Sequence, residues 1–433
     1  MVNINCYFCY MISTGDLYQV YLQHPTVQTD TRKLQPGDVF FALKGPNFNA
    51  NAFAHDALNA GAAYVVADEL TGAPDDKILL VEDVLSSLQE LALHHRRTFD
   101  IPFIAITGSN GKTTTKELIH TVLSSKYITY TTEGNLNNHI GIPLTLLKIK
   151  KDAEIAVIEM GANHLKEIEA YCRYVLPTHG IITNCGKAHL EGFGSPEGVR
   201  KAKGELFDFL RGNNGTAFIF DDYDYLHEMS AGIEKIIPYG IHKGFVSGNI
   251  AHNKPYIAVQ IKDGPMIETQ LVGDYNLPNI LCAAAVGKYF HIPQDVVAAA
   301  IAGYTPSNSR SQLVEQGTNK IIFDAYNANP SSMMAAIENM AGIESGRKVL
   351  VLGAMKEMGA DSIAEHQQLV DQIAQYKWKH VALVGGDFAK TDHNFLYFPT
   401  PEEAGKWLHA QQLQHAYILI KGSRGIAMEK VLG

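Results

Sequence analysis

The stretch "AITGSNGKTTTKELI", residues 105–119, places two glycines, a lysine and three threonines directly after an apolar run. The pattern predicts a strand over Phe103–Thr107, a loop over 108–111 and a helix from Lys112 onward. Glycines let backbone amides approach an anion, the helix start contributes its positive dipole end, and Lys112 adds a charge. We expect a nucleotide phosphate site here, with an ordinary glycine-rich turn as the alternative. The expected nucleotide contacts are Gly108, Ser109, Asn110, Gly111, Lys112, Thr113 and Thr114.

The spacing of this motif is shorter than the general P-loop pattern, which would place glycine where the chain has Ile106. The variant Thr-Gly-x-x-Gly-Lys-Thr-Thr keeps the glycines and the lysine on which phosphate binding depends. The Thr113 hydroxyl is a candidate ligand for Mg²⁺.

Length and composition bound the rest of the prediction. With 433 residues, of which 46% are apolar and 19% charged, the chain is expected to form about three globular domains. The net charge of −9 and the absence of basic runs exclude an extended nucleic-acid surface. No apolar run is long enough for a membrane span, and we expect no membrane insertion.

Five scattered cysteines favour a reducing, cytoplasmic location over a disulfide framework. Cys6 and Cys9 form a C-x-x-C pair, but no second pair and no neighbouring βαβ pattern accompany them. We therefore do not predict a metal or redox site at this pair.

Strands and helices alternate along the chain, which predicts an α/β fold with three domains. Residues 1–100 read as a small α/β domain, and residues 101–310 as a doubly wound, P-loop nucleotide-binding domain. Residues 311–433, with the strands "NKIIFD", "RKVLVLG", "HVALV" and "AYILI", read as a Rossmann-like domain. The stretch "YIAVQIKDGPMIETQL" predicts an antiparallel hairpin, and "NLPNILCAAAVGKYF" a buried helix.

Three residues are candidates for metal chemistry, and the first two of them lie near expected strand ends. Glu159 follows the strand Ile155–Ile158, where open α/β sheets place their ligands, and its carboxylate suits Mg²⁺; a charge at a helix start is the alternative. His189 follows the strand "GIITN" through a short loop, although a lone histidine is more often structural. Lys203 is a cation that cannot itself ligate Mg²⁺, and a solvated lysine on the helix after Gly198 is the alternative.

An ordered set of motifs then links these residues to a family. The stretches "TDTRK", "FALKG", "GSNGKTTTKE", "GNLNNHIGIPLTLL", "IEMGANHLKEI", "AHLEGFGS", "AKGELF", "DAYNANPSSM" and "KGSRGIAMEKV" resemble the Mur ligases of peptidoglycan precursor synthesis. The resemblance covers nearly the whole chain. "GANH" and "AHLEGFGS" indicate the branch that joins D-alanyl-D-alanine to UDP-N-acetylmuramoyl-tripeptide, rather than its sister ligases or folylpolyglutamate synthase.

The resemblance implies a cofactor set and a catalytic set. ATP is the nucleotide, and two Mg²⁺ ions are held with the help of Thr113, Glu159, His189 and Lys203, the last of these carbamylated by CO₂. Lys112, Glu159, His189 and Lys203 are the implied catalytic residues. Asn279, Arg310 and Asp324 are implied to contact the adenine, the nucleotide and the ribose, where capping, a solvated hinge arginine and a capping aspartate are the alternatives.

Substrate contacts are also implied by the resemblance. Thr31, Arg32, Lys44 and Gly45 match the UDP-binding edge, although "PNFNANAF" departs from the Asp-Gly-His pattern that often stands there. Asn135 and Asn138 match the sugar and peptide channel, and Tyr326, Asn327, Asn329 and Lys421 match residues of the third domain that position ligands. Turn chemistry alone would also use these asparagines. Ala354 stands where related ligases often carry aspartate, so no role is assigned to it.

Two other functions are compatible with the fold. Folylpolyglutamate synthase shares the ATPase chemistry, but an expected UDP-binding module precedes the P-loop here. A non-catalytic protein that keeps the nucleotide fold as a scaffold is the other alternative, which the combination of Lys112, Glu159, His189 and Lys203 disfavours. We expect a monomer, and the third residue of the tripeptide, lysine or diaminopimelate, stays open.

Overall fold

The computed structural model describes residues 11–253, 255–306 and 310–433. The pair Cys6 and Cys9 lies outside these residues. The chain forms two compact units. The first consists of Met1–Ala105, Ile128–Met160 and Glu169–Pro177, and the second of Ile106–Tyr127, Gly161–Ile168 and Thr178–Gly433.

A four-stranded parallel sheet forms the centre of the first unit, in the order β1 (Val27–Gln28), β2 (Val39–Phe41), β5 (Tyr64–Ala67) and β6 (Ile78–Leu80). β2 is buried along its whole length because side chains cover both faces of the sheet. Phe40 and Val65 pack with Ala54 and Ala57 of α2 (Ala54–Asn59) on one face. The unit also contains α1 (Thr14–Gln23), η1 (Thr31–Lys33), β3 (Lys44–Gly45), β4 (Phe48–Asn49), η2 (Ala50–Phe53), α3 (Val84–Arg96), β8 (Thr129–Thr131), α5 (Gly141–Leu147) and β9 (Ile155–Glu159).

The strand β7 (Phe103–Thr107) runs from the first unit into the second. In the first unit, β9 lies between β7 and β8, and the Ala156 amide donates to the Pro102 carbonyl at 3.0 Å. In the second unit, β10 (His179–Ile182) lies beside the other end of β7, and the Thr183 amide donates to the Thr107 carbonyl at 3.0 Å. The sheet continues through β11 (Thr216–Phe220), β12 (Lys235–Gly240), β13 (Val246–Asn253), β14 (Ile257–Ile261) and β15 (Met266–Glu268).

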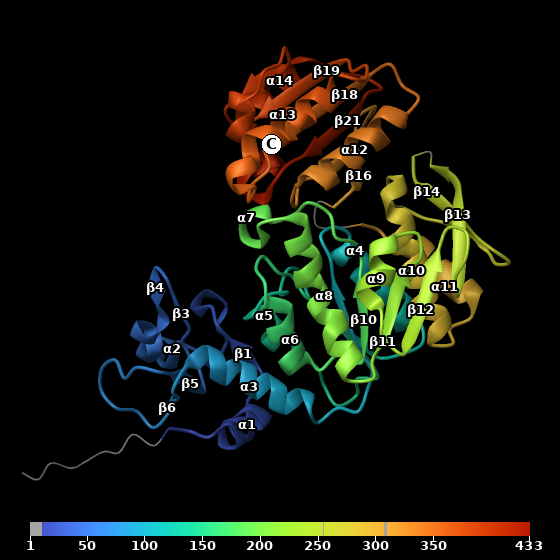
Figure 1. Ribbon diagram of the computed structural model, residues 1–433. Coiled ribbons are helices and arrows are strands. Elements are labelled where there is room, and N and C mark those ends of the chain that lie inside the picture. The colour runs from blue at the N-terminus through green and yellow to red at the C-terminus, as the bar shows by residue number, and fades with distance from the viewer. Residues whose placement is uncertain (1–10, 254, 307–309) are drawn as a thin grey trace, which may run out of the picture. The chain divides into compact units, whose positions relative to one another are not determined.

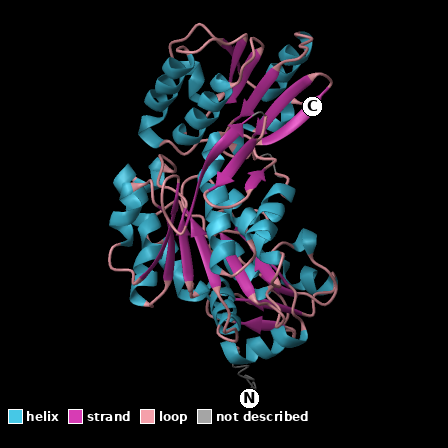
Figure 2. Cartoon of the chain, turned by 90° about the vertical axis from the view of Figure 1, so that its right-hand side faces the viewer, coloured by secondary structure: helices cyan, strands magenta, loops and turns pink. Residues whose placement is uncertain are grey.

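Helices cover both faces of this sheet in the second unit (Figure 2). On β10, His179 contacts Tyr289 and Phe290 near the end of α10 (Leu277–Tyr289), whereas the next residue, Gly180, packs against Leu206 of α8 (Pro196–Gly212). Because successive strand residues point to opposite faces, α8 and α10 lie on opposite sides. This unit also holds α4 (Lys112–Ser124), α7 (Leu190–Phe193), α9 (Asp224–Ser230), η3 (Asp274–Asn276) and α11 (Gln294–Gly303), and α6 (Glu167–Val175) spans the unit boundary.

A separate six-stranded sheet closes the chain, in the order β16 (Gln312–Gln316), β17 (Asn319–Asp324), β21 (Tyr417–Lys421), β18 (Lys348–Gly353), β19 (His380–Val384) and β20 (Leu396–Phe398) (Figure 1). β16 is antiparallel to β17, and the other pairs are parallel. One face packs on α14 (Pro401–Ala410) through Ala404 and Leu408. The remaining elements are α12 (Pro330–Gly342), η4 (Gly359–Asp361), α13 (Ser362–Ile373), η5 (Gly386–Lys390), η6 (Arg424–Ile426) and η7 (Met428–Val431).

Both tryptophans of the chain belong to this last sheet region. The Trp378 indole donates to the Ile373 carbonyl at 2.8 Å, and Trp407 on α14 packs beside His380 and Phe398. These contacts anchor α13 and α14 to the sheet.

The predicted α/β class is confirmed, as are the predicted strands β7, β17, β18, β19 and β21, the hairpin β14–β15 and the buried helix α10. The three large sheets fall within residues 27–80, 103–268 and 312–421. The domain limits at 100 and 310 stay predictions. Within the described residues, no helix combines the length and the apolar character needed to cross a membrane.

Candidate active site at the phosphate-binding loop

The predicted strand, loop and helix occur where the sequence places them, as β7, residues 108–111 and α4. Gly108 and Gly111 have φ values of 142° and 79°, a region that favours glycine. A Cβ on Gly111 would lie 2.7 Å from the Asn279 Oδ1 atom, and one on Gly108 would collide with the Thr183 hydroxyl. Both glycines are therefore required by backbone conformation and by close packing.

The residues after β10 hold the loop in its conformation. The Ser109 and Asn110 amides donate to the main-chain and side-chain oxygens of Asn184 at 2.9 and 3.0 Å. The Thr183 hydroxyl donates to the Asn110 carbonyl at 2.6 Å, and the Ser109 hydroxyl to the Gly186 carbonyl at 2.8 Å. Asn184 was missed in the sequence because "TNCGKAH" has no feature that connects it with the loop.

Lys112 begins α4 and folds back over the loop. Its Nζ atom donates to the carbonyls of Gly108 at 2.7 Å and Ser109 at 3.2 Å. An ammonium group at this point, together with the positive end of α4, makes the loop suited to a phosphate group. Thr113 is 4% exposed in the first turn of the same helix.

Asn279 is engaged in contacts between α10 and α4. Its Oδ1 atom accepts from the Thr115 hydroxyl at 3.0 Å, and its Nδ2 atom donates to the Asn276 side chain at 3.0 Å. The Asn276 Nδ2 atom donates in turn to the Val272 carbonyl at 2.9 Å. Asn279 thus sits against the phosphate-binding loop, and its hydrogen bonds also fit the packing alternative.

In the first unit, Glu159 is the last residue of β9 and is 1% exposed. Its Oε1 atom accepts from the Asn137 side chain at 2.8 Å. Asn137 lies in "GNLNNHIG" between the predicted Asn135 and Asn138. Its place in this motif is the only sequence feature that could have indicated it as a site residue. Asn138 accepts from the Gly141 amide at 2.8 Å, which is turn chemistry, while Asn135 is exposed.

His189 and Lys203 belong to the second unit. The His189 Nδ1 atom lies 2.5 Å from the Glu357 Oε2 atom, and this contact lowers the pKa of Glu357. Lys203 is 1% exposed on α8, and its Nζ atom donates to the Ala162 carbonyl at 3.1 Å. Burial, together with the nearby charge of Lys112, lowers the pKa of Lys203 to about 7. The alternative of a solvated lysine is therefore wrong.

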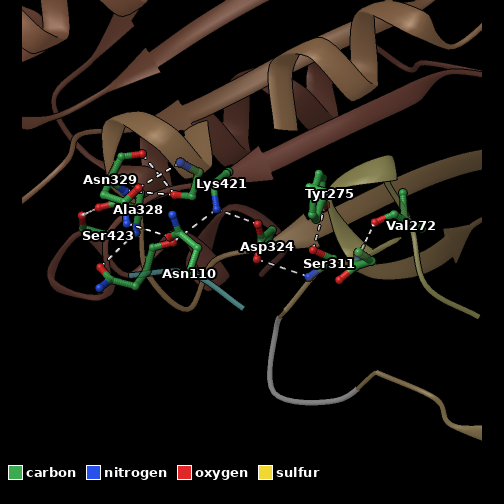
Figure 3. A network of polar contacts seen from close by, with 12 residues as sticks. Asn110, Val272, Tyr275, Ser311, Asp324, Ala328, Asn329, Lys421 and Ser423 are labelled. Carbon is green, nitrogen blue, oxygen red and sulfur yellow. Dashed lines mark hydrogen bonds and ion pairs between the residues drawn. The ribbon is translucent and has the colours of Figure 1, made fainter. Parts of the chain in front are cut away.

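A polar network connects Tyr275, just before α10, with the last sheet (Figure 3). The Asp324 carboxylate, at the end of β17, accepts from the Ser311 amide at 3.2 Å and from Lys421 Nζ at 2.6 Å. Lys421 is 2% exposed and also donates to the Asn327 carbonyl at 3.3 Å. The Ser311 hydroxyl is hydrogen-bonded to Tyr275 at 2.8 Å, just before α10.

One further contact joins the last sheet region to the loop, and another joins two predicted site residues to each other. The Asn329 Nδ2 atom donates to the Asn110 Oδ1 atom at 2.8 Å (Figure 3). Asn329 also caps α12, where its side chain accepts from the Ser332 amide at 2.9 Å. The Arg310 guanidinium lies 3.5 Å from the ring centre of Tyr326, so these two predicted residues stack on each other.

The predicted UDP contacts lie in the first unit and pair with carboxylates there. Arg32 binds both oxygens of Asp30 at 2.9 and 2.8 Å, and Lys44 contacts Asp68 at 2.9 Å and Glu69 at 2.6 Å. Thr31 begins η1, and Gly45 in β3 is covered by the ring of Phe48. The described part of the chain contains no cluster of three or more His, Cys, Asp or Glu residues that could hold a metal ion.

Comparison with known proteins places this geometry in a family. Residues 106–287 match the Mur ligase middle domain, and residues 309–424 match the Mur ligase glutamate ligase domain. The UDP-N-acetylmuramoyl-tripeptide–D-alanyl-D-alanine ligase of Escherichia coli is 36% identical over 97% of this chain and 96% of its own length. The chain belongs to the Mur ligase family.

Solved Mur ligase structures agree with this assignment. A crystal structure of MurF from Acinetobacter baumannii is 28% identical with a TM-score of 0.87 and covers 98% of both chains. The MurF ligase of Thermotoga maritima, solved in complex with ADP, is 27% identical with a TM-score of 0.86, over 95% of this chain and 97% of its own. The Mur ligase middle domain includes Lys112, Glu159, His189 and Lys203, and the glutamate ligase domain includes Arg310, Asp324 and Lys421.

Proposed function

We propose that the protein is an ATP-dependent ligase that joins D-alanyl-D-alanine to the terminal carboxylate of UDP-N-acetylmuramoyl-tripeptide in cytoplasmic peptidoglycan precursor synthesis. Similarity to ligases of this specificity over nearly the full chain supports the substrate pair. The single structural observation that carries the proposal is the loop of residues 108–111, with Lys112 folded over two of its carbonyls. That geometry is suited to the phosphates of ATP.

We assign nucleotide binding to the loop and to residues of α4, α10 and the last sheet region. Lys112 and the start of α4 contact the phosphates, Asn279 contacts the adenine, and Asp324 contacts the ribose. The Asn329–Asn110 hydrogen bond supports the participation of the last sheet, because it joins the loop to the start of α12. The remaining nucleotide contacts are Gly108, Ser109, Asn110, Gly111, Thr113, Thr114 and Arg310.

Thr113, Glu159, His189 and Lys203 would hold two magnesium ions. The residues fit such ions, since Mg²⁺ takes few protein ligands and fills its shell with water and phosphate oxygens. Glu159 is a buried carboxylate held by Asn137 at a strand end, which also fits. When bound, magnesium supplies positive charge that stabilises the transferring phosphoryl group.

Lys203 is proposed to be carbamylated by CO₂. A pKa near 7 leaves a large fraction of its amine neutral at physiological pH, and only the neutral amine is a nucleophile. The ammonium group first loses one proton to solvent, and the neutral nitrogen then attacks the carbon of CO₂ and releases a second proton, so a cation is replaced by a carbamate anion. The anion can support magnesium, as the cation cannot.

The reaction proceeds in two steps on the substrates. The terminal carboxylate of the tripeptide attacks the γ-phosphorus of ATP, forming an acyl phosphate and releasing ADP. The free amine of D-alanyl-D-alanine then attacks the acyl carbon, and the tetrahedral intermediate collapses to the amide with loss of phosphate. Lys112 orients the phosphates and offsets their charge, and enforced proximity of the reactants contributes the rest.

The three-domain assignment becomes part of this proposal. Residues 1–100 bind the UDP moiety through Thr31, Arg32, Lys44 and Gly45, residues 101–310 bind ATP, and residues 311–433 bind the dipeptide. Asn135 and Asn138 line the sugar and peptide channel, while Tyr326, Asn327, Asn329 and Lys421 position ligands from the last sheet. One chain supplies every residue named here, so a monomer is sufficient for the proposed reaction.

Lys112→Ala tests the role of the loop. Loss of the amine removes a phosphate contact, and kcat for phosphate release should fall at least about 100-fold. Lys126→Ala, at a surface lysine that donates to the His291 carbonyl, is the matched control and should retain wild-type turnover. An unchanged kcat in Lys112→Ala would remove the loop from the mechanism.

Substrate specificity is tested with the wild-type protein. Phosphate release is measured with ATP and either UDP-N-acetylmuramoyl-tripeptide plus D-alanyl-D-alanine or a folate plus glutamate. Turnover with the second pair alone would establish the folylpolyglutamate synthase alternative, and UDP-precursor binding without any turnover would favour a binding protein. Mass spectrometry of the product from a mixture of both tripeptides identifies the third residue as lysine or diaminopimelate.

A further inference from the structure

The contact between His189 and Glu357 joins two segments that lie far apart in the sequence. His189 precedes α7 in the loop after β10, and Glu357 lies in the loop after β18 of the last sheet. Their side chains meet at 2.5 Å between Nδ1 and Oε2. The Glu191 amide also donates to the Glu357 carbonyl at 3.4 Å, so main chain and side chain both take part.

This geometry selects one form of the imidazole. A carboxylate only accepts, so an imidazole that pairs with it through Nδ1 carries the proton on Nδ1 and keeps the lone pair of the neutral ring on Nε2. A histidine that ligates a metal usually donates its other ring nitrogen to a carboxylate, which fixes the tautomer and the ring orientation. Glu357 stands in that relation to His189.

Glu357 is itself held in place by the last sheet region. The Met355 amide donates to His366 Nε2 at 3.0 Å, and His366 Nδ1 donates to the Ser362 carbonyl at 2.7 Å. The Lys356 amide donates to the Ser423 hydroxyl at 2.9 Å. Glu357 has a φ of 64°, an uncommon value for a side-chain-bearing residue, and these neighbouring hydrogen bonds fix it.

We infer that Glu357 is a positioning residue for His189, supplied by the last sheet, which orients the imidazole for the second magnesium ion. This inference rests on the proposed function, since His189 must be a metal ligand for Glu357 to act through it. Its consequence is that the second metal site is complete only when the loop after β18 lies against α7.

The chain offers a matched control for this carboxylate. Lys187 Nζ contacts Glu365 at 2.6 Å, so Glu365 is a second acidic residue of the last sheet region that pairs with the loop after β10. It does not touch His189. Glu365→Gln therefore removes a comparable ion pair without affecting the imidazole.

The test is a Mn²⁺ titration, followed by electron paramagnetic resonance, of the full-length protein saturated with β,γ-methylene-ATP. Wild type should bind two Mn²⁺ ions per chain. Glu357→Gln should weaken one of the two sites about 10- to 100-fold and leave the other unchanged. Glu365→Gln should bind both ions as wild type does, and in His189→Ala the further change Glu357→Gln should have no effect.

Wild-type affinities for both ions in Glu357→Gln would overturn the inference, as would an equal loss in the presence and absence of His189. Wild-type ligase turnover is measured in parallel. If the wild type forms product but binds a single Mn²⁺ ion, the inference fails while the proposed function stands. If it forms no product, the proposed function itself fails.

Discussion

At the scale of single residues, Lys421 shows that a side chain predicted to bind a ligand can already be bonded to another residue of the protein. Its ammonium group is 2% exposed and binds the Asp324 carboxylate at 2.6 Å. Two such charges stabilise each other only as a pair, because removal of one leaves the other poorly solvated. Lys421 therefore fixes Asp324, the carboxylate that we propose contacts the ribose.

Lys421→Met should lower the free energy of unfolding of the last sheet region by about 3 kcal/mol, because Asp324 loses its partner. Urea denaturation measures this change. The double variant Lys421→Met/Asp324→Asn is the control and should recover part of the loss. A single variant as stable as wild type would show that the pair contributes nothing to the fold.

Gly111 makes a second prediction at this scale. Gly111→Ala forces a side chain into a left-handed conformation with its Cβ 2.7 Å from Asn279 Oδ1, so stability should fall by about 1–3 kcal/mol and ADP affinity with it. Calorimetric titration with ADP and thermal unfolding measure the two effects. Gly212→Ala, where an added Cβ meets no atom within 4 Å, should change neither.

At the scale of elements, the start of α12 performs two tasks with one side chain. Asn329 accepts from the Ser332 amide as a helix cap and donates to Asn110 in the phosphate-binding loop. An aspartate can accept but has no amide to donate. The two tasks can therefore be separated by substitution.

Asn329→Ala should lower stability by about 1 kcal/mol through loss of the cap, whereas Asn329→Asp should keep the stability of wild type. Both variants should weaken ADP binding, because both lose the hydrogen bond to Asn110. Thermal unfolding and calorimetry give the two readouts. ADP affinity in Asn329→Asp equal to that of wild type would exclude a role for this contact.

The packing of β10 on α10 makes a pH-dependent prediction. Burial among Phe218, Tyr289 and Phe290, and then the charge of Lys235, lower the pKa of His179 to about 4. Below the unfolded value of about 6.5 the unfolded chain binds a proton that the folded chain does not, so stability falls as the pH drops from about 6.5 toward 4. Above about pH 6.5 this loss of stability is absent.

His179→Phe removes this proton linkage and keeps an aromatic ring in the cluster. Between about pH 7 and pH 5 the wild type should lose up to about 2 kcal/mol more than the variant. Urea denaturation followed by circular dichroism at both pH values measures the difference. Equal losses in the two proteins would show that His179 titrates in the folded state as it does in the unfolded state.

The elements differ in how far the sequence predicts them. β7 and α4 could be predicted because an apolar run, two glycines and a lysine each impose a local requirement. β16 and β20 were not predicted, since "QLVEQ" and "LYF" are partly exposed edge strands with little apolar signal. The contact of His189 with Glu357 could not be read at all, because it depends on how distant segments pack.

Charged residues show the same limit. Lys44 belongs to a motif that resembles a UDP-binding edge. It forms ion pairs with Asp68 and Glu69, which directly follow β5. Lys203 appeared solvated by pattern alone, and burial on α8 became visible only in three dimensions. The sequence indicates that these lysines are candidates for function, but it does not show which groups surround them.

At the scale of the whole molecule, ligand binding should be visible as stability. A ligand that binds only the folded chain stabilises it, so ADP with Mg²⁺ at about 100 times its dissociation constant should stabilise the protein by about 2.7 kcal/mol. Thermal unfolding with and without ADP measures this shift. Lys112→Ala should show a smaller shift at the same ADP concentration, and an identical shift would place the nucleotide elsewhere.

The location of Trp378 and Trp407 has a practical consequence for all such measurements. Excitation at the long-wavelength edge of the protein absorption spectrum selects tryptophan, and both tryptophans belong to the last sheet region. The emission of the native chain is thus a built-in optical reporter of residues 311–433, with no label required. Melting of the other two sheets would leave that signal almost unchanged, so a single emission trace would overstate how cooperatively the polypeptide denatures.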